Sequence, residues 1–92
     1  MRFLNSKLKI ENTILQTIAK KYGTPAYCYS YKQLRENIND FKKNFKSISP
    51  LICFAIKSNT NLNLIKEIKK FGLGADVVSM GELMLALKAG IS

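Results

Sequence analysis

A lysine that directly follows a long apolar run is the first residue of this sequence that could do chemistry. Lys57 comes immediately after the six apolar residues Leu51–Ile56. An apolar run without alternation is typical of a strand whose two faces are both covered, as in a parallel sheet between helices. Residues at the carboxyl ends of such strands face the ligand crevice. A lysine at such a strand end would be part-buried at a binding site, where burial would lower its pKa.

The unprotonated amine of such a lysine can condense with an aldehyde to form a Schiff base. This is the way in which a lysine holds pyridoxal phosphate. The alternative is that Lys57 simply begins a loop and points into water. Position alone favours this alternative, because polar residues end most strands.

Two carboxylates accompany the next strand candidate, residues 74–78. Asp76 lies late in that strand, where it is either an acid of the pocket or a structural carboxylate with its own partner. Glu82 follows Ser79 by three residues, which is the spacing of a capping box at the start of a helix. We expect Glu82 to cap the helix, with direct contact to a ligand as the second alternative.

The elements that would position these three residues alternate between helices and strands. In residues 1–49 we expect a helix, a strand and a long helix. Ile14, Ile18 and Tyr22 recur at a spacing of four and predict the first helix. Residues 26–29 are short, aromatic and apolar, and predict a strand.

The long helix is predicted to begin after Ser30, which has capping-box spacing to Gln33. Apolar residues at spacings of four, three and four then form one face of this helix. Those residues are Leu34, Ile38, Phe41 and Phe45.

Residues 50–92 are predicted to form two βα units. The strands are 51–56 and 74–78, and the helices are expected from Leu62 to Phe71 and from Ser79 to Gly90. Strands about 20 residues apart are typical of right-handed parallel crossovers. Two such units leave strand edges unpaired. The pattern therefore predicts an α/β fold that is truncated from a larger barrel or sheet.

The formal net charge is +9, which raises the possibility of a polyanionic partner. The lysines are dispersed, however, and no motif of the common nucleic-acid-binding modules accompanies them. We therefore expect solvated helix faces and no nucleic acid, and keep a small basic binding module as a non-enzymatic alternative. A degraded gene remnant without function is a third alternative.

Two cysteines, Cys28 and Cys53, lie in short apolar runs, and the sequence has no histidine. Neither a redox pair nor a zinc site fits this pattern, so we expect two buried, reduced thiols and no metal. No apolar run approaches the ~20 residues that span a bilayer, and the N-terminus lacks the apolar core of a signal peptide. We expect a cytoplasmic protein without membrane contact.

Three segments resemble successive segments of diaminopimelate decarboxylases in order and spacing. The segments are residues 24–29, 53–59 and 74–83. The middle segment, Cys-Phe-Ala-Ile-Lys-Ser-Asn, is similar to the cofactor-lysine motif that ornithine and arginine decarboxylases and alanine racemases share. The third, with Asp-Val-Val-Ser-Met-Gly-Glu-Leu, is more specific to diaminopimelate decarboxylases.

The resemblance implies the first part of a pyridoxal-phosphate barrel of eight βα units, with 51–56 and 74–78 as its first two strands. Lys57 would hold the cofactor, and Asp76 and Glu82 would lie on the cofactor side of the barrel. The implied activity is decarboxylation of meso-2,6-diaminopimelate to L-lysine and CO2 by a homodimeric parent protein. An ornithine, arginine or carboxynorspermidine decarboxylase of the same fold is the runner-up.

The sequence departs from that family in several places. The ring-stacking histidine, the phosphate loop, the acid that pairs with the pyridinium nitrogen and the substrate-binding arginine are not in these residues. Neither cysteine corresponds to the one that a partner subunit donates, and Met80 occupies a position that is commonly glycine. We therefore expect the 92-residue chain to be inactive by itself.

Overall fold

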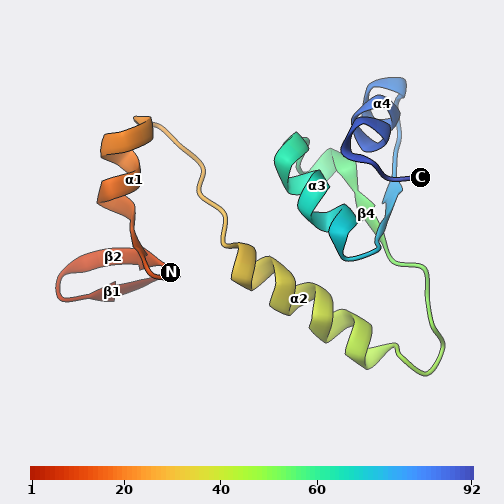
Figure 1. The fold of residues 1–92 in the computed structure, drawn as a ribbon, viewed down its shortest axis with the longest axis horizontal. Helices are drawn as coiled ribbons and strands as arrows, with labels where there is room; N and C mark the ends of the chain where they lie inside the picture. The colour runs from red at the N-terminus through yellow and green to blue at the C-terminus, as the bar shows by residue number, and fades with distance from the viewer. The chain divides into compact units, whose positions relative to one another are not determined.

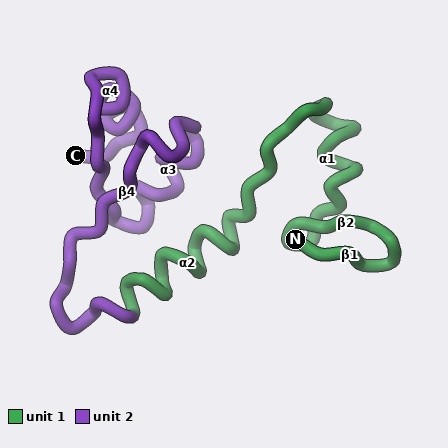
Figure 2. Tube along the Cα trace, turned by 180° about the vertical axis from the view of Figure 1, so that it is seen from behind, with its two compact units in different colours: residues 1–43 green, residues 44–92 purple.

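The computed structural model describes all of residues 1–92 and contains two compact units, residues 1–43 and residues 44–92 (Figure 2). α2 (Tyr31–Asn44) ends just beyond the first unit.

The first unit begins with three short antiparallel strands. They are β1 (Arg2–Leu4), β2 (Lys7–Ile10) and β3 (Thr13–Ile14), in the order β1-β2-β3. Neighbouring antiparallel strands satisfy each other's backbone groups across tight turns, so this meander forms from local contacts. The sequence analysis did not predict it.

The strand predicted at residues 26–29 is wrong. This segment has no regular secondary structure, and Tyr27 is 92% exposed. Aromatic and apolar composition favours a strand only where a partner strand and a covered face are available. Residues 26–29 have neither in this unit.

Both predicted helices of the first unit are confirmed. α1 spans Leu15–Tyr22 and ends at Gly23, and α2 begins after Ser30, whose Oγ accepts a hydrogen bond from Gln33 N at 3.0 Å. The Gln33 side chain does not return this bond, because it donates to Asn37 Oδ1 at 2.8 Å. A carboxylate also caps this helix start: Lys32 N donates to Glu11 Oε1 at 3.0 Å.

The second unit contains the two predicted βα units (Figure 1). Its elements in chain order are β4 (Cys53–Ala55), the 3-10 helix η1 (Ile56–Ser58), α3 (Leu62–Lys70), β5 (Gly74–Asp76) and α4 (Met80–Ala89). β4 and β5 pair in parallel, as expected. Both strands are shorter than predicted, because β4 and β5 each have one partner and the ladder joins only three residue pairs.

The core of the second unit lies between this sheet and its two helices. Ile56 at the end of β4 and Ile65 on α3 are fully buried, and they meet small residues of α4. Ala86 and Ala89 face them, and Ile91 closes the cluster. The short alanine side chains let α4 approach Ile56 and Ile65 closely. This packing holds Ile56 in place, and with it the backbone of the residue that follows, Lys57.

Both ends of α4 are capped by the residues that the sequence indicated. Ser79 Oγ accepts from Glu82 N at 3.1 Å at the first end. Gly90 adopts φ +96°, which an L side chain rarely tolerates, and Ile91 N then donates to Ala86 O at 3.0 Å. This is a Schellman arrangement, and it turns Ile91 into the core.

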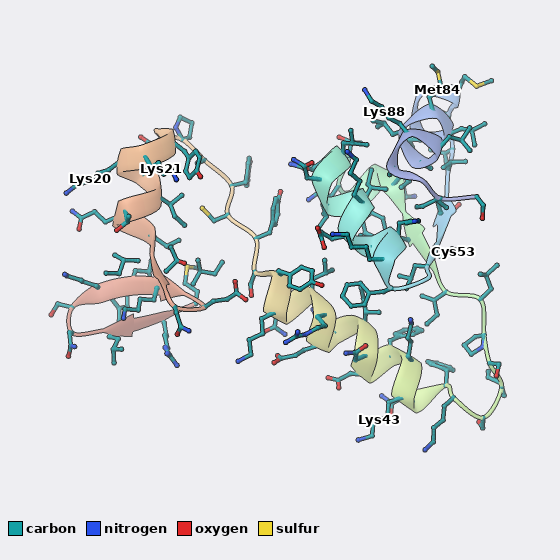
Figure 3. The ribbon with its side chains drawn as sticks, viewed as in Figure 1. Lys20, Lys21, Lys43, Cys53, Met84 and Lys88 are labelled. Atoms are coloured by element: carbon teal, nitrogen blue, oxygen red, sulfur yellow. The ribbon has the colours of Figure 1, made fainter.

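The opposite face of α4 is apolar and exposed. Met80, Leu83, Met84 and Leu87 recur at helical spacing and are 39–71% exposed. Met84 and Lys88 both project away from the packed side (Figure 3). A helix that is apolar all round is typical of a buried position, which fits the expectation that the fold is part of a larger one.

The fold class is thus α/β with two parallel βα units, and these residues do not close a barrel. No helix is long and apolar enough to span a membrane. The prediction of buried thiols is wrong, since Cys28 and Cys53 are free and exposed. Cys28 lies in the irregular segment after α1, and Cys53 begins an edge strand with an uncovered face.

Candidate functional site

The parallel pair of strands gathers the three predicted site residues at one edge of the sheet. In the register of β4 and β5, Ala55 lies opposite Asp76. Lys57 follows Ala55 by two residues, and Glu82 lies in the first turn of α4, which follows β5. The carboxyl ends of parallel strands meet at the same edge, which is where ligands bind in α/β folds.

Lys57 lies within η1 rather than at the end of an extended strand. Its neighbour Ile56 is fully buried, whereas Lys57 itself is exposed, and its amine makes neither a hydrogen bond nor an ion pair. The prediction of a part-buried lysine is therefore wrong for these residues. The reason is structural: with only β4 and β5 at this edge, there are no neighbouring strands and loops to cover the side chain.

Asp76 is the last residue of β5 and is exposed. Its carboxylate has no hydrogen-bond partner or ion-pair partner, so the interpretation as a structural carboxylate with its own partner finds no support. Two uncommitted groups of opposite charge, the amine of Lys57 and the carboxylate of Asp76, thus stand on the same edge of the sheet.

The Glu82 carboxylate is committed to the start of α4. Its Oε1 accepts from Val78 N at 3.3 Å, and its Oε2 lies 3.5 Å from Ser79 Oγ. Glu82 N also donates to Ser79 Oγ, as in the predicted capping box, but the returning bond comes from Val78 N, one residue before the N-cap. Glu82 therefore acts on the backbone that follows β5, and its two oxygens point at its own helix start.

Side-chain hydrogen bonds hold the turn after Lys57, whose residues were predicted only to form a turn. Ser58 Oγ donates to Ala55 O at 2.7 Å, and Asn59 Oδ1 accepts from Asn61 N at 3.0 Å. Asn61 Oδ1 accepts from Asn63 N and Leu64 N, which makes Asn61 the N-cap of α3. An asparagine directly before an apolar run at helical spacing is a signal that could have identified this cap.

Three hollows in the two units lie away from these residues. An apolar one of about 330 Å³ and a polar one of about 380 Å³ belong to the first unit. The third, of about 360 Å³, lies at the opposite edge of the β4–β5 sheet, where Cys53 and Gly74 begin the strands. No group of His, Cys, Asp and Glu side chains is arranged to hold a metal ion.

Comparison with known proteins decides the family. Residues 31–92 match the family described as "Pyridoxal-dependent decarboxylase, pyridoxal binding domain". This chain belongs to the pyridoxal-dependent decarboxylase family. The matched residues include β4, β5 and the whole edge that carries Lys57 and Asp76.

Relatives of this chain carry a more specific name. The diaminopimelate decarboxylase of Aquifex aeolicus is 42% identical over 91 residues, which are 99% of this chain and 21% of the relative. That of Neisseria meningitidis serogroup A is 44% identical over 73 residues, 79% of this chain and 18% of the relative. The chain thus spans about a fifth of the length of the relatives it matches.

A solved structure supports the fold of this family member. A crystal structure of an Aquifex aeolicus protein superposes with a TM-score of 0.91 at 42% sequence identity. It covers 98% of this chain, which covers 22% of the solved one. The predicted α/β architecture is therefore confirmed as the N-terminal part of a pyridoxal-dependent decarboxylase fold.

The residues at this edge fit one end of pyridoxal phosphate, the cofactor that the family's name implies. An uncommitted primary amine on a rigid support suits the aldehyde carbon of that group. The phosphate end finds no cradle here, because at the start of α4 the Val78 and Glu82 amides already donate to side chains. These residues therefore suit the attachment of the group rather than the clamping of its phosphate.

Proposed function

We propose that this chain provides the cofactor lysine of a pyridoxal-phosphate-dependent decarboxylase that converts meso-2,6-diaminopimelate to L-lysine and CO2. The observation that carries the proposal is the position of Lys57. It lies at the carboxyl edge of a parallel sheet with an uncommitted amine, inside the segment that matches the pyridoxal-binding family. The substrate is taken from the names of relatives about 40% identical to this chain.

Each residue at the edge has a distinct part in this proposal. Lys57 is the catalytic residue: its amine would hold pyridoxal phosphate through the aldehyde carbon and would be free once the substrate amine holds the cofactor instead. When bound, the cofactor supplies an electron sink for the carbanion that remains after CO2 leaves. Lys57, once released, stays at the end of β4 with an amine that can hold or move a proton.

Asp76 and Glu82 are assigned supporting parts. Asp76 stands on the same edge with an uncommitted carboxylate, so it is placed to accept a hydrogen bond from the cofactor or substrate. Glu82 fixes the backbone between β5 and α4 through Val78 and Ser79, and so holds the Asp76 strand end in place. We further propose that the complete enzyme is a cytoplasmic homodimer that binds no nucleic acid.

Borohydride trapping tests the attachment of the cofactor. The protein expressed from its complete reading frame is mixed with pyridoxal phosphate, reduced and mapped by peptide mass spectrometry. Lys57 is expected to carry the label in strong preference to the other twelve lysines. Even labelling of all lysines would overturn the assignment of Lys57, and Lys66 is a suitable reference because it is exposed on α3 of the same unit.

Release of CO2 tests the substrate. The same protein is expected to release CO2 from meso-diaminopimelate, and Lys57→Ala is expected to abolish the release while leaving the fold intact. Faster release from ornithine or arginine would assign the chain to another decarboxylase of this fold. The 92-residue chain alone is expected to release no CO2, because these residues hold no cradle for the phosphate.

A further inference from the structure

The turn that carries Lys57 is held at both ends by fully buried residues. Ile56 precedes the lysine and Ile65 lies on the first turns of α3, and both are 0% exposed in the same core. The eight residues between them, 57–64, are largely exposed and hold no side chain of the core cluster itself. Apolar packing therefore fixes the ends of this segment but not the residues around the amine.

Side-chain hydrogen bonds fix the middle of the segment instead. Ser58 Oγ donates to Ala55 O at 2.7 Å, a bond that spans Ile56 and Lys57. Asn59 N donates to Ile56 O at 3.1 Å, so the two residues after the lysine are both tied to the two residues before it. The backbone of Lys57 thus lies inside both of the short loops that these two hydrogen bonds close.

The bonds continue from this turn to the helix. Asn59 Oδ1 accepts from Asn61 N at 3.0 Å, and Asn61 Oδ1 accepts from Asn63 N and Leu64 N at 2.9 and 3.2 Å. Side chains that bond nearby backbone groups in this way hold irregular segments that have no ladder of their own. The intervening residue, Thr60, is exposed, and its hydroxyl makes no such bond.

We propose that Ser58 and Asn59 are positioning residues for Lys57. They hold the lysine-bearing turn rigid between β4 and α3, so the amine is presented to an aldehyde carbon from a fixed backbone. This inference deepens the proposed function and rests on it. The amine of a lysine lies at the end of a flexible chain of four carbons. When the Cα position is fixed, only the side-chain rotations remain to be restricted before the amine reaches a productive geometry.

Amide hydrogen exchange tests the rigidity without any cofactor. In the protein from the complete reading frame, Ser58→Ala is expected to speed exchange at the Asn59 amide about fivefold, the equivalent of one net hydrogen bond. Thr60→Ala is the matched control, because it removes an unbonded hydroxyl from the same segment, and is expected to change nothing. Ser58→Thr keeps the hydroxyl and is expected to restore slow exchange.

The Ile68 amide separates positioning from general stability, because Ile68 is buried in the interior of α3 and its exchange reports the opening of the core. It is expected to be unchanged in all three variants. Equal exchange at Asn59 in Ser58→Ala and Thr60→Ala would overturn the proposal, and so would an equal acceleration at Ile68. Asn59→Ala is expected to act like Ser58→Ala, here at the Asn61 amide, and Asn59→Ser to restore part of the protection because a serine oxygen can accept the same bond.

The reactivity of Lys57 tests the consequence. The rate of Lys57 labelling by pyridoxal phosphate and borohydride, divided by that of Lys66, is expected to fall about fivefold in Ser58→Ala and to stay unchanged in Thr60→Ala. Preferential labelling of Lys57 that survives Ser58→Ala unchanged would overturn the positioning role and leave the proposed function standing. Absence of preferential labelling in the unsubstituted protein would overturn the proposed function itself.

Discussion

The two units of this chain are built by opposite means. Residues 44–92 enclose a core in which Ile56, Ile65 and Ile68 are at most 1% exposed. In residues 1–43, α1 has no buried residue, and Ile38 on α2 is the buried apolar side chain. The first unit is held mainly by an antiparallel ladder and local caps, and the second by packing between a parallel sheet and two helices.

The difference fits the assignment of the candidate site to the second unit. A strand end that serves as a support must resist local opening, and resistance to opening comes from buried apolar contacts. Lys57 is bonded directly to the fully buried Ile56, whereas the exposed segment around Tyr27 in the first unit has no comparable anchor. We expect the first unit to open more readily than the second.

The largest expected effect is that of truncating a core isoleucine. Ile65→Ala leaves a cavity in the second unit and is expected to lower the free energy of unfolding by about 2–5 kcal/mol. The matched change in the first unit, Ile18→Ala, affects a half-buried residue on α1 and is expected to cost about 1 kcal/mol. Amide exchange within each unit measures both, and equal losses would mean that the two units are equally well packed.

The helix caps offer a closer comparison, because each unit has a serine cap. Ser79→Ala in the second unit is expected to cost about 1–2 kcal/mol, since it removes a bond to Glu82 N and one side of a reciprocal capping box. Ser30→Ala removes a single bond to Gln33 N and is expected to cost about 1 kcal/mol. Urea unfolding followed by circular dichroism compares them, and a larger loss for Ser30→Ala would contradict the reciprocal role of Glu82.

The close approach of β4 and β5 gives a smaller effect. A Cβ atom at Gly74 would lie 3.0 Å from Cys53 Sγ, so Gly74→Ala forces the thiol to move. The expected cost is about 1 kcal/mol, at the low end for overpacking because Cys53 is exposed and can rotate away. Adding Cys53→Ala removes the clash and is expected to recover the loss, and a thermal unfolding scan of the double variant that shows no recovery would place the strain elsewhere.

The smallest expected effect is that of the surface ion pair in the second unit. Lys70 Nζ lies 2.9 Å from Glu67 Oε1 on α3, with the lysine side chain 63% exposed. Water and salt screen such a pair, so Glu67→Gln is expected to change the free energy of unfolding by only about 0.3 kcal/mol. A loss above that of Ser79→Ala would show that charge rather than packing stabilises the second unit.

Prediction from sequence succeeded where local signals and burial agreed. The capping pair Ser79 and Glu82, and the stop at Gly90, gave both ends of α4 because the atoms that form a cap are neighbours in sequence. It failed at residues 26–29, where an apolar, aromatic composition was not matched by a partner strand. It also missed the meander at residues 2–14, whose short polar strands carry little apolar alternation.

The candidate site was predicted in its residues more than in its geometry. Lys57 and Asp76 lie at one edge as expected, because a parallel crossover brings the ends of successive strands together. The exposure of Lys57 agrees with the alternative that its position alone favoured, in which the residue begins a loop and points into water. The commitment of the Glu82 carboxylate to its own helix start agrees with the first of the two alternatives, and the roles of Ser58 and Asn59 became visible only with their bonding partners.

The sequence by itself determined the helices and the order of the two βα units, because those features depend on periodicity, caps and neighbours along the chain. Only the tertiary structure decided the register of the strands, how far Lys57 is covered and which carboxylate is uncommitted. Those properties depend on residues that are distant in sequence, such as Ile56 with Ile91 and Ala55 with Asp76. Burial and strand register depend on many such long-range contacts, and a local sequence pattern does not specify these contacts.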